Sequence, residues 1–496
     1  MPGLSRRKLI AGLGSASAGV AFSGFPAVFA RTTAERSLEG LARALAGPVL
    51  FPGDAMFSEL SLPRNLRFAS TIPRAVALCR DANDIAKALV WARETETPFA
   101  IRGGGHNYML ASTSPGLIIS TRLMNSAKVR SGALEAGAGI LNRDLGKLLA
   151  NGGRGELILP GGNCPNVGLT GATLGGGIGP NAPWAGLAAD RLTSVTMVTS
   201  SGDMVAASAS SNPDLFWALR GSAGGNLGIV TGLEYALLPI PVSRGTTFRA
   251  AWSGAVAALN VVTAWQKVKA SEPRLISGTC SVSRDSNDVG AFIRGQILAD
   301  EEAARELLAP LLRHQPISVD VTERPWWDVY SWYVTRPSPN YSFWDRSLFA
   351  DGDLPESAIG ATIEICRKFP SSRAGCKGSF TLFGWVGGVV SDIHPQSTAY
   401  VHRNARALLE ISVGWPSIRM DRGQIEPVPP DIRAWSDELW SVIHPHTTGR
   451  SYQNFPDPDL KDSQQAYYGE NLERLKAVKK KWDPDNVFNY SQSIKA

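Results

Sequence analysis

Two glycine-rich passages place the tightest limit on how this chain folds. Residues 101–110 read IRGGGHNYML, and a second passage runs from Pro160 to Gly179. Three consecutive glycines lose backbone entropy on folding and bury no side chain, so the loop is either a plain turn or a place where another group approaches the backbone closely. Successive backbone N–H groups of this kind can form a nest for an anion such as a pyrophosphate.

Neither passage matches the common nucleotide-binding loops. The P-loop pattern G-x-x-x-x-G-K-[ST] does not occur in the chain, and no glycine cluster has the G-x-G-x-x-G spacing of a Rossmann turn. If these loops bind phosphate, they do so in another kind of fold.

The segments around the loops alternate between strand and helix patterns. Residues 73–100 predict strand, turn, amphipathic helix and strand, with Asp81 or Asn83 as the helix cap and Ile85, Leu89 and Val90 on the inner face. Residues 116–123 predict a strand, 133–153 a strand and a helix, and 194–208 a hairpin. Helix, glycine loop and strand follow over 212–239, and 469–482 predict an amphipathic helix near the end. The pattern is typical of mixed α and β structure.

Length and charge bound the class of protein. A chain of 496 residues is too long for one core, which favours two or three domains. The net charge of +6 falls to +3 without residues 1–30, because three of the 50 basic residues lie there and none of the 44 acidic ones does. The basic run at 479–481 is interpreted as a solvated helix face, so no nucleic-acid partner is expected.

The first 30 residues have the pattern of an export signal. A basic start, SRRKLI at 5–10, precedes a weakly apolar segment rich in Gly and Ser that ends at Val28-Phe29-Ala30. The paired Arg6 and Arg7 resemble a twin-arginine signal, which predicts cleavage near Ala30 and a periplasmic or secreted protein. The alternative is a membrane anchor, but no segment has the ~20 apolar residues that a span needs, so no stable membrane insertion is expected.

The five cysteines are too few and too scattered for a disulfide framework or a zinc site. An oxidising compartment allows disulfides among Cys79, Cys280, Cys366 and Cys376, and the last two are near enough in sequence to close a small loop. No metal is expected. Cys164 lies among glycines and is a separate case.

Four motifs occur in an order that resembles one flavoprotein family. They are RGGGHNY at 102–108, GGNCPNVGLTGATLGGGIG at 161–179, PDLFWALRGSAGGNLGIVT at 213–231 and WDPDNVFNYSQSI at 482–494. Together they resemble the berberine-bridge-enzyme-like oxidases of the vanillyl-alcohol-oxidase and p-cresol-methylhydroxylase group. The resemblance is strong over residues 70–240 and 449–494 and weaker between them.

The resemblance implies an α+β fold with five segments. After the signal peptide (1–30) and an N-terminal segment (31–69), a PCMH-type FAD-binding domain of two subdomains would cover 70–240. A substrate domain with an antiparallel sheet backed by helices would cover 241–445. A C-terminal berberine-bridge-like segment (446–496) would return to the FAD domain.

The resemblance also implies FAD held by two covalent bonds. The histidine at the place of His106 bonds to the flavin 8α-methyl in this family, and the cysteine at the place of Cys164 bonds to flavin C6. Without the resemblance, His106 would be interpreted as a loop histidine and Cys164 as a structural thiol. The implied cofactor-binding residues are Arg102, Gly103, Gly104, Gly105, His106, Asn107, Cys164, Val167, Gly168, Gly171, Gly175, Gly176, Gly177, Gly228, Val230, Tyr452 and Asn454.

Catalysis in the family removes a proton from a substrate O–H or N–H while the adjacent C–H transfers hydride to the flavin, and oxygen is then reduced to hydrogen peroxide. Val167 falls where a small residue admits oxygen, which favours an oxidase with a small-molecule substrate and O₂. The usual Tyr-x-Asn-Tyr reads Tyr452-Gln453-Asn454-Phe455 here, so the usual catalytic base is missing. Tyr452 and Asn454 are the remaining catalytic candidates.

Three questions stay open at this level. His444 and His446 lie just upstream and could act as base, although histidines flanked by proline in a loop are more often surface residues. The protein could instead be a dehydrogenase with another electron acceptor, or a covalent-flavin binding protein that has lost catalysis. An aromatic stretch offers either faces that stack on a sugar or aromatic ring, or core residues: Trp326, Trp327, Tyr330, Trp332, Tyr333 and Trp344. Neither the substrate nor the oligomeric state follows from the sequence.

Overall fold

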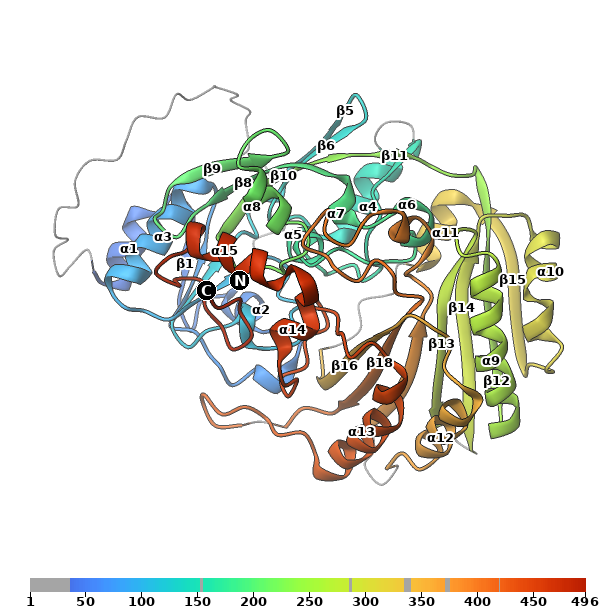
Figure 1. The fold of residues 1–496 in the computed structure, drawn as a ribbon. Helices are drawn as coiled ribbons and strands as arrows, with labels where there is room; N and C mark the ends of the chain where they lie inside the picture. Colours follow the sequence, from blue (N-terminus) through green and yellow to red (C-terminus); the bar gives the residue numbers. More distant parts are fainter. Residues whose placement is uncertain (1–35, 152–154, 285–287, 334–339, 371–374, 419) are drawn as a thin grey trace, which may run out of the picture.

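The computed structural model describes residues 36–151, 155–284, 288–333, 340–370, 375–418 and 420–496. Two lobes lie side by side in Figure 1, one built on two sheets from the first half of the chain and one built on a single large sheet. The C-terminal segment crosses from the second lobe back onto the first. The predicted signal peptide and its Arg6 and Arg7 lie outside the described residues.

The first sheet has the strand order β1-β2-β4-β3, in which β2, β4 and β3 are parallel. Parallel strands need a crossover connection, and α3 supplies the one between β2 and β3, which lie on either side of β4. Asp81 is the N-cap of α3 and accepts a hydrogen bond from Asp84 N at 3.0 Å. Ile85 and Leu89 are fully buried, as predicted for the inner helix face, whereas Val90 is half-buried. The elements are α1 (Leu38–Ala44), β1 (Val49–Leu50), α2 (Phe57–Ser61), β2 (Ala75–Leu78), α3 (Ala82–Glu94), β3 (Phe99–Arg102) and β4 (Leu117–Ser120).

The second sheet is antiparallel, in the order β5-β6-β10-β8-β9. The predicted hairpin at 194–208 is confirmed as β8 and β9, and the helix predicted within 133–153 is confirmed as α4. The elements of this part of the chain are β5 (Ala127–Arg130), β6 (Ala133–Gly137), α4 (Asn142–Asn151), β7 (Leu157–Ile158), α5 (Leu169–Leu174), α6 (Ala182–Ala185), α7 (Ala188–Arg191), β8 (Leu192–Val198), β9 (Met204–Ser208), α8 (Pro213–Ala218), β10 (Ile229–Ala236) and β11 (Leu238–Pro239). Strands β7 and β11 pair with each other in a separate two-stranded sheet.

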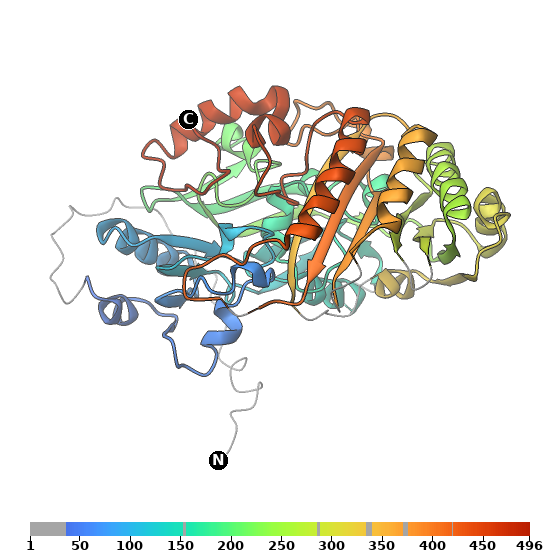
Figure 2. The same cartoon turned by 90° about the horizontal axis from the view of Figure 1, so that it is seen from below.

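The second lobe is a seven-stranded antiparallel sheet in the order β15-β12-β14-β13-β17-β18-β16. Helices α13, α12, α9 and α10 cover one face, lying side by side in Figure 2, and the largest apolar core lies between them and the sheet. The elements are β12 (Arg244–Ser253), α9 (Ala255–Ser271), β13 (Ile276–Arg284), β14 (Val289–Ile297), α10 (Glu301–Leu312), β15 (Ser318–Pro325), α11 (Trp326–Tyr333), β16 (Ser342–Ala350), α12 (Glu356–Arg367), β17 (Lys377–Phe383), β18 (Ala407–Trp415) and α13 (Pro430–Ile443).

The other face of this sheet is turned toward the first lobe. Gln296 on β14 donates to Pro180 O at 3.2 Å and to Asn181 Oδ1 at 2.7 Å. The alternation of side chains along a strand therefore separates a helix-covered core face from a face that meets the two small sheets. The predicted α+β fold, with an antiparallel sheet backed by helices, is confirmed. The predicted domain boundaries stay predictions.

The C-terminal segment is held on the first lobe by helices α14 (Ser463–Tyr468) and α15 (Leu472–Trp482). The prediction that the lysines at 479–481 form a solvated face is wrong for Lys479. Its ammonium is fully buried and donates to Asp483 Oδ2 at 2.6 Å, Asn226 O at 2.8 Å and Phe488 O at 2.6 Å. The Lys479 ammonium can be buried because it donates hydrogen bonds to backbone carbonyls where the end of the chain meets the first lobe.

Lys479→Met is expected to destabilise the protein by about 3–5 kcal/mol, because it leaves the buried Asp483 carboxylate without its cation. Lys480→Met is the matched control, since Lys480 is exposed and surface changes usually stay within about 0.5 kcal/mol. Urea unfolding at constant pH measures both. Equal midpoints for the two variants would contradict the structural role of Lys479.

The disulfides that an oxidising compartment would allow are not formed among the described residues. Cys79, Cys280 and Cys366 are buried free thiols, so a Cys366–Cys376 bond is excluded. Cys366 lies on the inner face of α12, where its Sγ contacts Val282 O at 3.8 Å in the core of the second lobe. Among the described residues, no helix is long and apolar enough to cross a bilayer.

Candidate functional site

A cavity of about 530 Å³ lies between the two lobes. Its first wall consists of the loop after β3, the segment 162–178 and residues 223–230 of the first lobe. The opposite wall consists of strands β13, β14, β17 and β18, and residues 452–456 close one side. The volume falls within the range of about 300–1,000 Å³ that is usual for ligand sites.

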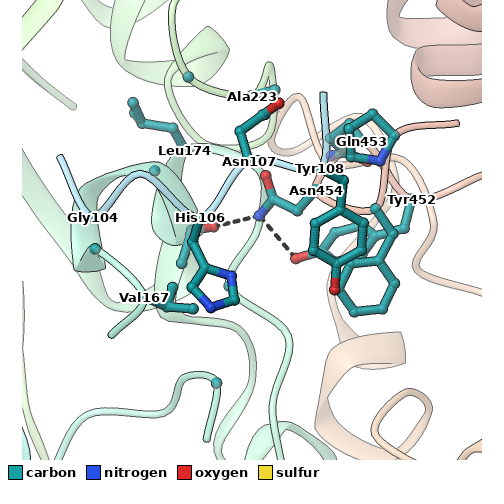
Figure 3. A pocket seen from close by; sticks show the side chains of 18 of the residues that line it. Gly104, His106, Asn107, Tyr108, Val167, Leu174, Ala223, Tyr452, Gln453 and Asn454 are labelled. Atoms are coloured by element: carbon teal, nitrogen blue, oxygen red, sulfur yellow. Dashed lines mark hydrogen bonds between the residues drawn. The ribbon is translucent and has the colours of Figure 1, made fainter. Parts of the chain in front are cut away.

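The two glycine-rich passages touch each other at the edge of this cavity. A Cβ on Gly104 would lie 2.4 Å from Gly168 N, and one on Gly168 would lie 2.7 Å from Gly104 N. Gly105 has a φ of +69°, which favours glycine. The contact brings His106 from the first passage and Cys164 and Val167 from the second into the same cavity, and Figure 3 shows His106 beside Val167.

Burial determines the protonation state of His106. Burial, with Arg64 nearby, lowers the pKa of His106 to about 4. Its imidazole is therefore neutral at pH 7 and keeps a nitrogen lone pair, which is the form that can act as a nucleophile or ligand.

Tyr452 and Asn454 form a hydrogen-bonded pair against the second glycine passage. Asn454 Nδ2 donates to Ala172 O at 2.9 Å and to Tyr452 Oη at 3.1 Å, the two dashed lines in Figure 3. Tyr452 Oη also accepts a bond from Ile178 N at 3.3 Å. Burial raises the pKa of Tyr452.

Phe455, which stands where the second tyrosine is usual, stacks on Tyr108. The ring centroids are 5.2 Å apart with an angle of 9° between the planes. Tyr108 follows His106 in the first glycine passage, is half-buried and lines the cavity. Burial and the nearby Glu410 and Asp345 raise the pKa of Tyr108 well above its usual range. The phenol that Phe455 lacks is thus replaced nearby by that of Tyr108, two residues after His106.

Two carboxyl groups that the sequence analysis missed lie near this phenol. Glu410 on β18 lines the cavity, and the buried Asp345 on the neighbouring β16 lies on the same face of the sheet, because it pairs with Ser412, two residues from Glu410. Burial raises the pKa of Asp345 to about 7, and burial together with Asp345 raises that of Glu410 well above its usual range. The pair therefore holds a proton near neutral pH. A lone acid in the middle of an apolar strand, as in SFWDRSLFA and ALLEISVGW, is the signal that could have found them.

Comparison with known proteins identifies the family. Residues 73–208 match the family described as FAD binding domain, and residues 451–495 match that described as berberine and berberine like. The FAD-linked oxidoreductase YgaK of Bacillus subtilis (strain 168), itself uncharacterized, is 31% identical over 465 residues, which cover 91% of this chain and 97% of that protein. The chain belongs to the berberine-bridge-like FAD-linked oxidoreductases.

A relative with a named substrate is similar over nearly the same length. The chitooligosaccharide oxidase of Gibberella zeae is 27% identical over 89% of this chain and 91% of its own. A solved chitooligosaccharide oxidase matches with a TM-score of 0.78 and 26% identity over 92% of this chain and 98% of that chain. The berberine-bridge-like protein 1 of Physcomitrella patens matches with a TM-score of 0.80 and 25% identity over 92% and 99%.

The residues of this berberine-bridge-like oxidoreductase fit FAD, although only some of the glycines leave room for its phosphates. A Cβ on Gly171 would meet nothing within 4 Å, and one on Gly103 nothing closer than 3.7 Å, so a phosphate could approach both. The backbone N–H groups of two touching glycine loops offer the anion nest that the sequence predicts. His106 and Cys164 supply the two nucleophilic side chains beside it.

Other predicted cofactor residues have packing roles. A Cβ on Gly175 would collide with Asn454 Oδ1, one on Gly177 with Ala188 Cβ and one on Gly228 with Met197 Cε. Gly175, Gly176 and Arg102 do not line the cavity, whereas Asn107, Gly168, Gly177, Gly228 and Val230 do. Arg102 points away from it and anchors its loop by donating to Ser112 O at 2.8 Å and Leu60 O at 2.6 Å.

Most of the aromatic stretch, and both His444 and His446, lie outside the cavity. Of the six aromatic residues proposed as stacking faces, only Tyr333 lines the cavity. Trp326 and Trp344 are buried, and Trp327 Nε1 donates to Gly155 O at 2.7 Å at the contact with the first lobe. His444 and His446 are exposed at the end of α13, which agrees with their interpretation as surface residues and removes them as candidates for the base.

Proposed function

We propose that this oxidoreductase holds FAD covalently through His106 and Cys164 and oxidises a C–H next to an alcohol or amine, with O₂ as electron acceptor and hydrogen peroxide as product. The observation that carries the proposal is that a neutral imidazole and a thiol from two separate loops line one cavity, because Gly104 packs on Gly168. The names of the chitooligosaccharide oxidase and of the carbohydrate oxidase of Microdochium nivale support a carbohydrate or similar polyol as substrate.

Glu410 is the proposed base. When bound, FAD supplies the acceptor for the substrate hydride. Glu410 lines the cavity, and burial together with the nearby Asp345 raises the pKa of its carboxyl group. A raised pKa makes a carboxylate a stronger base than it is in water. Tyr108, packed between Phe455 and Phe343, orients the substrate hydroxyl beside this pair.

Tyr452 has a different proposed role. Its oxygen already accepts two hydrogen bonds, from Ile178 N and Asn454 Nδ2, so its own O–H is available to donate into the cavity. A donor at this place steadies a bound polar group without taking its proton. Phe455 then contributes an apolar face and no proton transfer.

Val167→Leu tests oxygen as the acceptor and needs no knowledge of the substrate. We expect O₂ to reoxidise the photoreduced protein at least about tenfold more slowly, which corresponds to about 1.4 kcal/mol of added barrier. The added bulk beside His106 obstructs the approach of a small gas molecule. Stopped-flow absorbance gives the rate, and a peroxidase-coupled assay gives the peroxide formed per flavin. Val230→Leu, the same change at another cavity position, is the control.

Two outcomes would contradict the oxidase assignment. Wild-type protein that reoxidises slowly in air but quickly with a quinone is a dehydrogenase. Equal reoxidation rates in wild type and Val167→Leu would remove Val167 as the point of oxygen access.

A further inference from the structure

A single guanidinium stands on the cavity wall of the second lobe. Arg294 lies on β14, where Ile293 and Gly295 point into the helix-covered core, so Arg294 points to the opposite, cavity-facing side. Among the described residues that line the cavity, Arg294 is the only Lys or Arg. Its half-buried side chain is therefore the main positive charge of the site.

The described residues leave this charge without an anionic partner. Arg294 Nη2 donates one long bond, 3.3 Å, to Trp332 O, and its Cζ lies 4.9 Å from the Trp332 ring and 5.5 Å from the Tyr333 ring. No described Asp or Glu forms an ion pair with it, whereas its neighbour Arg249 on β12 pairs with Asp320 at 3.2 Å. The aromatic rings hold the guanidinium in place and leave its remaining N–H groups for a ligand.

The position of Arg294 does not suit it to bind the phosphates of FAD. The glycine loops that suit a pyrophosphate belong to the first lobe, whereas β14 belongs to the second. Thr279 pairs directly with Arg294 across β13 and β14, and Phe383 pairs with Thr279 on the next strand. All three side chains line the part of the cavity that the second lobe forms, which is the part left for substrate.

The register of the sheet gives the distance from Arg294 to the proposed base. Glu410 lies three strands away and two residues further along, through Thr279, Phe383 and Leu408. With about 4.8 Å between strands and about 3.3 Å per residue, the two Cα atoms are roughly 16 Å apart on the same face. Because side chains in a strand stand roughly perpendicular to the sheet, the two polar ends lie roughly as far apart as the two Cα atoms. A molecule of about two rings, with a hydrogen bond at each end, spans this distance.

We propose that the substrate carries a carboxylate that Arg294 binds, while the O–H or N–H whose proton Glu410 removes lies at the other end of the molecule. This inference rests on the proposed function. A guanidinium binds a carboxylate through two parallel N–H···O bonds, which fixes both the position and the direction of the substrate. Phe383, which lines the cavity and lies between the two groups in the strand register, contacts the apolar face of a ring.

The test compares acids with neutral partners of the same shape on the purified holoprotein. The probe pairs are cellobiouronic acid with cellobiose, and biphenyl-4-carboxylate with biphenyl-4-carboxamide, titrated by calorimetry at pH 7.5. We expect at least one acid to bind about tenfold or more tightly than its partner, as a charged hydrogen-bond pair provides. Arg294→Gln should remove this preference, and Arg294→Lys should keep part of it.

Arg249→Gln is the matched control, because it removes an exposed arginine from the neighbouring strand and should leave the preference unchanged. Equal binding of acid and neutral partner in both pairs, including no binding of either, would overturn the proposal, as would a preference that survives in Arg294→Gln. Calorimetry records binding without turnover. Loss of covalent FAD or of peroxide formation would contradict the proposed function instead, and the visible flavin spectrum confirms that each variant is folded.

Discussion

Glu410→Gln is expected to slow the reduction of the enzyme by its substrate about 10²–10⁴-fold, the usual effect of removing a general base. Glutamine keeps the size of the side chain at the cavity wall but cannot accept the proton. The rate of the wild-type protein should rise with pH, because the Asp345 and Glu410 pair must lose a proton first. Since burial raises the pKa of Asp345 to about 7 and that of Glu410 well above its usual range, this rise should lie at neutral or alkaline pH.

Anaerobic stopped-flow measurement of flavin bleaching checks this expectation, with a sugar, alcohol or amine found to bleach the wild-type protein. Glu323→Gln is the control, because Glu323 pairs with Arg244 at the edge of the same sheet, away from the cavity. Tyr452→Phe should reduce the rate less than Glu410→Gln does. A full rate in Glu410→Gln together with a large loss in Tyr452→Phe would return the base to Tyr452.

FAD should stay with the acid-precipitated protein and leave it only when both proposed attachment residues are changed. His106→Ala should keep FAD through Cys164, and Cys164→Ala should keep it through His106, since the two side chains reach the cavity from different loops. The double variant should release all of its FAD. The absorbance of the acid supernatant measures the release, and mass spectrometry of proteolytic peptides locates each bond.

Cys376→Ala serves as the control for the loss of a thiol, because Cys376 lies at the start of β17 and does not line the cavity. Free FAD in the supernatant of the unmodified protein would disprove covalent attachment. FAD that remains bound in the double variant would show that another residue of the cavity carries the bond.

The sequence by itself determined the local elements and the cofactor end of the site. The strand, helix and strand of residues 75–102 follow from side-chain periodicity and from the Asp81 cap, which act within a few residues. The glycine passages with His106 and Cys164 were recognisable for a related reason. A backbone that must pass close to another group, with positive φ at Gly105, tolerates few residue types.

The tertiary structure alone decided which distant residues meet. Asp345, Glu410 and Arg294 lie on three strands of one sheet, and only the strand order and register put them on the face that meets the first lobe. Lys479 has the same residue type as Lys480, yet only Lys479 is buried, because the chain end docks against Asn226. Gly104 and Gly168 are 64 positions apart and require each other's lack of a side chain. Burial and charge pairing depend on such non-local contacts, which a periodic pattern along the chain does not encode.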